Sequence, residues 1–208
     1  MSPYRLTGAD WKKIREADGV EVFAKSVDNS GLIAFKGVTI LPGSVPVILS
    51  VLRNEAGWHE WIEMYDFGRI LERKKKFHAI IYQAFDMPPL ISDRDLVMES
   101  KVSALPDGRS VEVKSHSVEH PDAPKTVGVR INLTFSNWVL TPVSDNESRA
   151  ILEVHSNPGG YIPQWLTNYV QRSYVTDLFS RLRDYLKRKG QDIVASDLPA
   201  PAAALGPE

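Results

Sequence analysis

Cysteine is absent from this sequence of 208 residues. Disulfides, thiolate nucleophiles and cysteine-based zinc or iron–sulfur sites are therefore excluded. An excess of either charge is absent too, because 25 Lys and Arg residues face 26 Asp and Glu residues and leave a net charge of −1. A chain this close to neutral has no overall field to attract nucleic acid, and we expect no nucleic-acid partner.

Long apolar runs are also missing. No stretch approaches the roughly 18 consecutive apolar residues of a membrane-spanning helix, and residues 1–11 lack the basic and apolar regions of a signal peptide. We therefore expect a soluble, cytoplasmic protein. Residues 198–208 are rich in Pro and Ala and hold few side chains that could offset the entropy of ordering them. The sequence thus predicts one domain over 1–190 and a disordered tail over 191–208.

The beginning of the domain predicts short elements separated by turns. A first helix is expected to end near Ala17, with Thr7 or Asp10 as its N-cap. The pair Asp18-Gly19 then predicts a turn. The elements expected next are strands over 20–26 and 32–41 and short helices over 45–52 and 55–62.

Alternation with a period of two dominates residues 66–156 and indicates strands. In residues 111–116 the odd positions are apolar or small, whereas the even positions are charged or polar. Residues 127–135 repeat this pattern, with apolar side chains at every odd position. Each strand then has one polar and one apolar face, which is typical of an antiparallel sheet covered on one side.

A long amphipathic helix over 162–189 is expected to cover the apolar face. Pro163 suits its first turn, the basic residues 187–189 suit its C-terminal end, and Gly190 is expected to end it. The predicted fold class is therefore α+β. It is a helix-grip fold, in which a curved antiparallel sheet wraps around a long C-terminal α-helix.

Six short motifs, taken in order along the chain, resemble those of one family. They are DGVEVF at 18–23 after Trp11, FKG at 35–37, Trp58 with Trp61, PPLISDRD at 88–95, Val129-Arg130 followed by WVLTP at 138–142, and NPGGYIPQWLTN at 157–168. Together they resemble the START (StAR-related lipid transfer) domain family, of the Bet v 1-like superfamily, in a single-domain form of bacterial type. The resemblance covers everything but the tail.

The resemblance implies that the protein binds, and can transfer, a lipid or other hydrophobic small molecule in an internal apolar cavity between sheet and helix. It also implies a gate formed by the start of the C-terminal helix and by the loop before the Arg-Asp motif. The gate residues expected from it are Pro88, Pro89, Leu90 and Arg94.

One departure from the family bears on the ligand. Steroid-binding members carry a buried acid–arginine pair on adjacent strands. Counted without gaps from Arg94-Asp95, the corresponding positions here are Ile81 and Ser100. An apolar wall at that point favours a ligand with little polar functionality, or one that is bound by other groups.

The expected ligand-binding residues are the inward positions of the strands and of the covering helix. They are Phe35, Ile81, Phe85, Leu96, Met98, Ser100, Val113, Ile131, Leu133, Phe135, Asn137, Leu152 and Val154 in the sheet, and Leu166, Tyr169, Val170 and Ser173 in the helix. Ser100 and Asn137, with Ser115 and Ser156, are the candidates for polar contacts to a ligand. Patterning alone also allows these side chains to pack a solid core.

Three further features have competing interpretations. Arg94 can contact a polar head group, or it can form a salt bridge that fixes the gate loop, which we favour. The basic run 72–76 can dock on anionic lipid, or it can be a solvated strand end, which we favour. Tyr161 and Trp165 can insert at a membrane interface, giving a transient membrane contact, or can pack in the core.

Catalytic and metal-binding motifs are absent from the sequence. The five histidines, at positions 59, 78, 116, 120 and 155, show no metal-binding spacing, and those at 116 and 155 fall on the polar faces of strands. No G-x-S-x-G nucleophile elbow is present. We expect no metal, no cofactor and no catalytic residue, and we expect a monomer that is not an enzyme.

Two alternatives to a lipid-binding protein stay open at this point. The first is an enzyme on the same scaffold, such as a polyketide cyclase or aromatase, which would orient its substrate in the equivalent cavity. The second is an interaction domain with a filled core.

Overall fold

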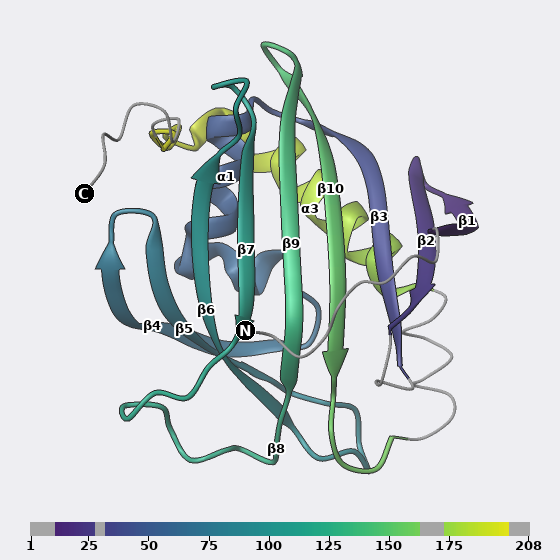
Figure 1. Cartoon of the computed structure of the whole chain (residues 1–208), viewed down its shortest axis with the longest axis vertical. Helices are drawn as coiled ribbons and strands as arrows, with labels where there is room; N and C mark the ends of the chain where they lie inside the picture. Colours follow the sequence, from purple (N-terminus) through teal and green to yellow (C-terminus); the bar gives the residue numbers. More distant parts are fainter. Residues whose placement is uncertain (1–10, 28–31, 163–172, 200–208) are drawn as a thin grey trace.

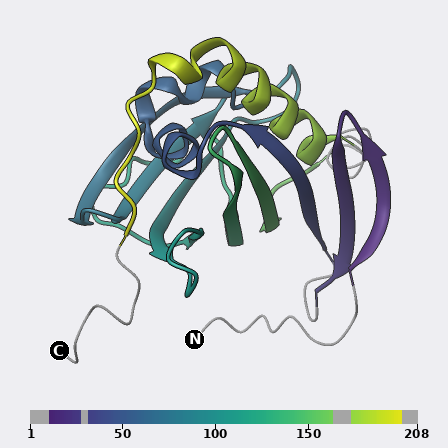
Figure 2. The same ribbon diagram turned by 90° about the horizontal axis from the view of Figure 1, so that it is seen from above.

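Helices lie against the concave face of a curved antiparallel sheet in the computed structural model (Figures 1 and 2). The structure describes residues 11–27, 32–162 and 173–199. Within them the sheet has the strand order β1-β2-β3-β10-β9-β7-β6-β5-β4, and β8 pairs with β6 off this path. This arrangement confirms the predicted helix-grip fold.

The strands are β1 Lys12–Ala17, β2 Val20–Ser26, β3 Ile33–Pro42, β4 Tyr65–Lys75, β5 His78–Phe85, β6 Arg94–Ala104, β7 Val111–Ser117, β8 Val129–Arg130, β9 Asn132–Ser144 and β10 Glu147–Asn157. The helices are α1 Val45–Arg53, α3 Tyr174–Lys189 and the 3-10 turns η1 Glu55–Glu60 and η2 Gly190–Asp192. The expected strands over 20–26 and 32–41 and the two short helices after them are therefore present, the second helix as a 3-10 turn.

The predicted first helix is wrong where the structure describes it, since β1 occupies Lys12–Ala17. Asp18 and Gly19 both have positive φ, at 52° and 69°. Two central residues with positive φ form the turn that matches the twist of a tight hairpin. The turn pairs Ala17 with Val20 and Glu16 with Glu21, so pairing with β2 overrides the helical pattern before it.

The C-terminal helix docks on the sheet at Gly37 of β3. A Cβ at this position would lie 2.3 Å from Cγ1 of Val175 and 2.5 Å from Cε2 of Phe179. Phe179 also meets Trp138 of β9 edge-on, with 5.4 Å between ring centroids. Gly37 therefore allows a close helix–sheet approach that any larger residue would prevent.

The bounds of the C-terminal helix differ in part from the prediction. The expected first residue, Ile162, lies in a loop, and α3 is described from Tyr174. Residues 163–172 of the predicted helix lie outside the described residues. At the other end the basic residues 187–189 fill the last turn as expected, and Gly190 continues into η2.

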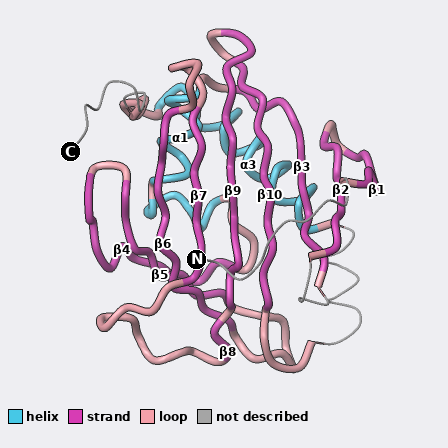
Figure 3. The backbone as a smooth tube through the Cα atoms, viewed as in Figure 1, coloured by secondary structure: helices cyan, strands magenta, loops and turns pink. Residues whose placement is uncertain are grey.

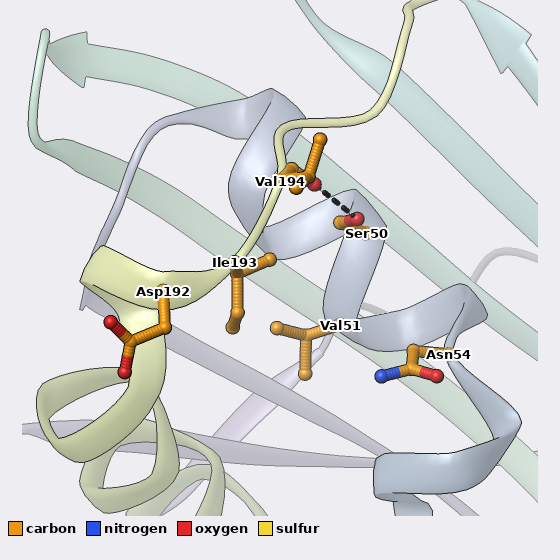
Figure 4. A pocket seen from close by; sticks show the side chains of 6 residues that line it. All are labelled: Ser50, Val51, Asn54, Asp192, Ile193 and Val194. Carbon is orange, nitrogen blue, oxygen red and sulfur yellow. Dashed lines mark hydrogen bonds between the residues drawn. The ribbon is translucent and has the colours of Figure 1, made fainter.

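The segment after η2 lies along α1, although composition predicted a disordered tail from residue 191. Ser50 donates a hydrogen bond to the Val194 carbonyl at 2.8 Å, and Arg53 donates one to Ser196 at 2.8 Å. Between α1 and this segment is a small cleft of about 270 Å³ (Figure 4), lined by Ser50, Val51, Asn54, Asp192, Ile193 and Val194. Residues 194 and 196 thus contact α1, while the bounds of the domain and of the tail stay a prediction.

We expect Gly37→Ala to lower the free energy of unfolding by about 1–3 kcal/mol, because the new methyl group forces Val175 and Phe179 away from β3. Gly190→Ala is the matched control, because a Cβ at Gly190 would have no atom within 4 Å. Urea unfolding of both variants checks this. Equal stability of the two variants would contradict the proposed close contact.

Candidate ligand-binding face and its gate

The pairing register of the strands defines which side chains share the concave face. Val154 pairs with Phe35 and with Ser136, Ser136 pairs with Ser115, and Ser115 pairs with Ser100. Paired residues point to the same face of a sheet. One row across β3, β10, β9, β7 and β6 therefore runs from an apolar end through three consecutive serines.

Most of the predicted site residues lie on this concave face. Ile81 and Val113 belong to the core that α3 covers, and Met98 and Val154 pack against it while staying partly buried. The predicted residues on this face are Phe35, Ile81, Phe85, Leu96, Met98, Ser100, Val113, Leu133, Leu152 and Val154.

Phe135 and Asn137 were predicted to face inward, and this is wrong. Leu133 pairs with Ser156, whereas Phe135 pairs with His155. Between these two pairs β9 advances by two residues while β10 advances by one. Such a bulge reverses the alternation for the residues that follow it. Phe135 and Asn137 therefore lie on the convex face, where the Phe135 ring stacks on His155 with 5.8 Å between centroids.

The remaining predicted residues have other positions. Ile131 lies half-buried in the gap of one residue between β8 and β9. Ser173 is the half-buried residue before α3. Leu166, Tyr169 and Val170 lie outside the described residues.

Several polar residues of the concave face were not predicted from the sequence, among them Ser136 and Gln83. After the bulge the even residues of β9 face inward, namely Ser136, Trp138 and Leu140. The apolar side chains at positions 138 and 140 are the sequence signal of this change. Gln83 shares the face of Ile81 and Phe85 on β5 and is 6% exposed. The alternation of β5 places Gln83 on this face, but a polar side chain was not expected at an inward position.

The hydrogen bonds of these polar groups are incomplete within the described residues. Ser115 donates to the Ser100 oxygen at 3.0 Å. Among the residues that the structure describes, neither the Ser136 hydroxyl nor the Gln83 amide has a side-chain hydrogen bond. A close-packed core rarely leaves a buried group such as the Gln83 amide without a partner.

Arg94 connects the two segments that were expected to form the gate. Its side chain is buried and donates hydrogen bonds to the carbonyls of Ser92, Gly159 and Tyr161, the last at 3.3 Å. Within the described ranges it forms no ion pair, so the expected salt bridge of Arg94 is wrong. Arg94 instead ties the β5–β6 loop to the chain after β10.

Asp95, next to Arg94, points to the convex face and is fully buried. It accepts hydrogen bonds from Arg130 at 2.5 and 3.1 Å, from the hydroxyls of Tyr82 and Thr126 at 3.2 Å, and from the N–H of Val127. Burial, with the charge of Asp95, raises the pKa of Tyr82 to about 12. This network fixes the loop between β7 and β8 against the sheet.

Three loops meet at one end of the molecule (Figure 3), namely 86–93, 118–128 and 158–162. The N–H of Val129 donates to the Asp93 carbonyl at 2.9 Å. The Arg94 side chain links the first loop to the third by its hydrogen bonds to the carbonyls of Ser92, Gly159 and Tyr161. At this end Leu90 is fully exposed with φ of 76°, and Tyr161 is 83% exposed. Two bulky side chains thus project into solvent at the end of the concave face where loops 86–93 and 158–162 lie, which we call its mouth.

The comparison with known families is decisive for the identity of the fold. The sequence matches the START domain family over residues 3–192. The chain belongs to the START domain family. This START domain is similar to an uncharacterized protein of Pseudomonas aeruginosa, with 29% identity over 81% of this chain and 80% of that protein.

Further similarity joins this START domain to proteins from animals. The phosphatidylcholine transfer protein of Mus musculus is 26% identical, and the match covers 88% of each chain. The solved structure of human StAR-related lipid transfer protein 5 superposes with a TM-score of 0.79 at 20% identity, covering 89% of this chain and 90% of that one. The latter similarity supports the fold.

The basic run 72–76 of the START domain is largely neutralised by neighbouring acids. Arg73 lies 3.6 Å from Glu55, Lys74 lies 2.6 Å from Glu99, and Lys76 lies 2.5 Å from Asp197. These pairs favour the interpretation as a solvated strand end. Within the described ranges, no helix is long and apolar enough to cross a membrane.

His155 departs from its expected position on a polar, solvated surface. It lies on the convex face but is only 2% exposed, and burial lowers the pKa of its imidazole. His116 is exposed as expected. In the part of the chain that the structure describes, no group of three or more His, Asp or Glu side chains is arranged to hold a metal ion.

We expect Arg130→Met to lower the free energy of unfolding by roughly 2–4 kcal/mol, because it leaves the buried Asp95 carboxylate without its cation. Lys114→Met is the control, since it removes the exposed pair with Glu112 and should cost less than about 1 kcal/mol. Chemical denaturation at pH 7 compares them. A loss for Arg130→Met no larger than that of the control would refute the role given to this network.

Proposed function

We propose that this START domain binds a lipid or another hydrophobic small molecule between the concave face of the sheet and the C-terminal helix. The main support is the composition of that face beyond Phe179. It combines partly buried apolar side chains, such as Met98 and Val154, with the half-buried Ser136 hydroxyl and the buried Gln83 amide, which have no side-chain hydrogen bond among the described residues. Apolar walls with a few convergent polar groups are typical of ligand sites.

The relatives support the same function. One is named a phosphatidylcholine transfer protein and another a StAR-related lipid transfer protein. Removal of the ligand's apolar surface from water would supply the binding free energy, at about 25 cal/mol per Å² before the costs of association. The proposed role is binding and transfer, with no catalytic step.

The gate in this proposal is the pair of segments that Arg94 joins. Loop 86–93 and residues 158–162 would separate to admit a ligand, which requires Arg94 to release the carbonyls of Gly159 and Tyr161. Leu90 and Tyr161 would enter the lipid interface at that moment, since both project into solvent at the same end of the molecule. A transient membrane contact would thus be coupled to opening.

Binding is tested by native mass spectrometry of the purified protein and organic extraction of any bound molecule. We expect a bound lipid, or uptake of one from vesicles. Met98→Glu should weaken uptake by roughly tenfold or more, because a carboxylate on the apolar face must be desolvated. Lys101→Glu, on the convex face of the same strand, is the control and should retain uptake. Circular dichroism checks that both variants fold.

Absence of lipid from the preparation, together with no uptake from vesicles of sterols, fatty acids or phospholipids, would refute the proposed function. Equal uptake by the two variants would place the ligand elsewhere.

The membrane contact has its own test. We expect the double variant Leu90→Asp/Tyr161→Asp to slow lipid transfer between vesicles roughly tenfold while leaving the amount of lipid bound at equilibrium unchanged, because two apolar contacts with the interface are lost. Val143→Asp is the control, since Val143 is also exposed but lies in β9 near the β9–β10 hairpin, at the opposite end of the molecule (Figure 1). Equal transfer rates for the two variants would rule out loop 86–93 as the contact.

A further inference from the structure

The polar groups on the concave face of the central strands are uncharged. In β3, β10, β9, β7, β6 and β5, as far as the structure describes them, the only charged side chain on this face is Arg94. Arg94 lies at the mouth, and backbone carbonyls already accept its hydrogen bonds. The other polar side chains on this face are serines, Gln83 and Thr39, and the Thr39 hydroxyl donates to the Gly19 carbonyl and accepts from Arg183.

The serine row lies directly beyond the part of the face that α3 covers. Ser136 is two residues from Trp138 on the same face of β9, a separation of about 7 Å along a strand. Trp138 contacts Phe179 of α3. Ser136, Ser115 and Ser100 therefore lie beside the part of the face that α3 covers, with Met98, Ile81 and Leu96 between them and the gate.

The hydrogen-bond inventory of the row points to a ligand group. Each hydroxyl has one donor and two acceptor sites. Ser115 uses its proton on Ser100, and this leaves the protons of Ser100 and Ser136 without an acceptor among the described residues. Gln83, about 13 Å further along the face by strand geometry, is 94% buried and also unpartnered there. Ser100 and Ser136 are half-buried and Gln83 is buried, so a ligand that displaces water from this face needs groups that can form hydrogen bonds with them.

Among the described residues of the strands, a charged head group would find no counter-charge at this row. Removing a phosphate or an ammonium group from water without a paired charge is far more costly than removing a hydroxyl or an amide. We propose that the serine row of Ser100, Ser115 and Ser136 selects a lipid whose polar part is an uncharged hydroxyl, ester or amide. That group is bound at the row, and the apolar chains lie over Met98, Ile81 and Leu96. This inference rests on the proposed function and names its ligand class.

The test offers vesicles that contain one of four radiolabelled probes: diacylglycerol, ceramide, phosphatidylcholine or phosphatidylglycerol. Protein-bound label is measured after the vesicles are removed. We expect at least one of the two uncharged lipids to be bound roughly tenfold more tightly than either phospholipid, because only the phospholipids carry charges to desolvate. Ser136→Ala should weaken that binding roughly three- to tenfold, the range expected for one lost hydrogen bond to a neutral group.

Ser103→Ala is the matched control, because Ser103 lies on the convex face of β6 and should leave binding unchanged. Tighter binding of a phospholipid, or an unchanged affinity of Ser136→Ala for the uncharged lipid, would overturn the selection while the lipid-binding function stands. Failure to bind any of the four probes would overturn the selection, and the proposed function would fall with it only if sterols and fatty acids were not taken up either.

Discussion

The close contact between α3 and β3 is the interaction on which the rest of the structure depends. A curved sheet with one apolar face is stable only when another element removes that face from water. Gly37 allows α3 to approach β3 closely, because Val175 and Phe179 occupy the space that a side chain at position 37 would fill. Phe179 then anchors on Trp138. The helix is thereby fixed over one part of the concave face, and the site that we propose begins where this contact ends.

Polar side chains on the two faces of the sheet differ in how completely they are hydrogen-bonded. On the convex face Asp95 is fully satisfied by Arg130, Tyr82, Thr126 and a backbone N–H, and a satisfied network of this kind makes the surrounding structure rigid. On the concave face, by contrast, Ser136 and Gln83 have no partner within the described ranges. The neighbouring Arg94 and Asp95 thus serve different faces. Arg94 holds two loops together by backbone carbonyls, whereas Asp95 holds a third loop by its carboxylate.

Much of the fold could be predicted, because period-two alternation and one long amphipathic segment leave few other arrangements. Most of the concave face followed from the same alternation. The errors have local causes. Lys12–Ala17 pairs as a strand because the Asp18-Gly19 turn closes a hairpin. Phe135 and Asn137 face outward because a bulge in β9 shifts the phase. The composition of the C-terminal segment predicted disorder, and it gave no sign of the contacts that residues 193–196 make with α1.

By itself the sequence determined the fold class, the family and the apolar character of one sheet face, since these depend on periodic patterns and on motifs that are local in the chain. Only the tertiary structure decided which side chains meet. The partner of Asp95 lies 35 residues away on Arg130, and the serine row joins three strands. Pairing register and bulges set these meetings, and both depend on contacts between distant strands that no local pattern encodes.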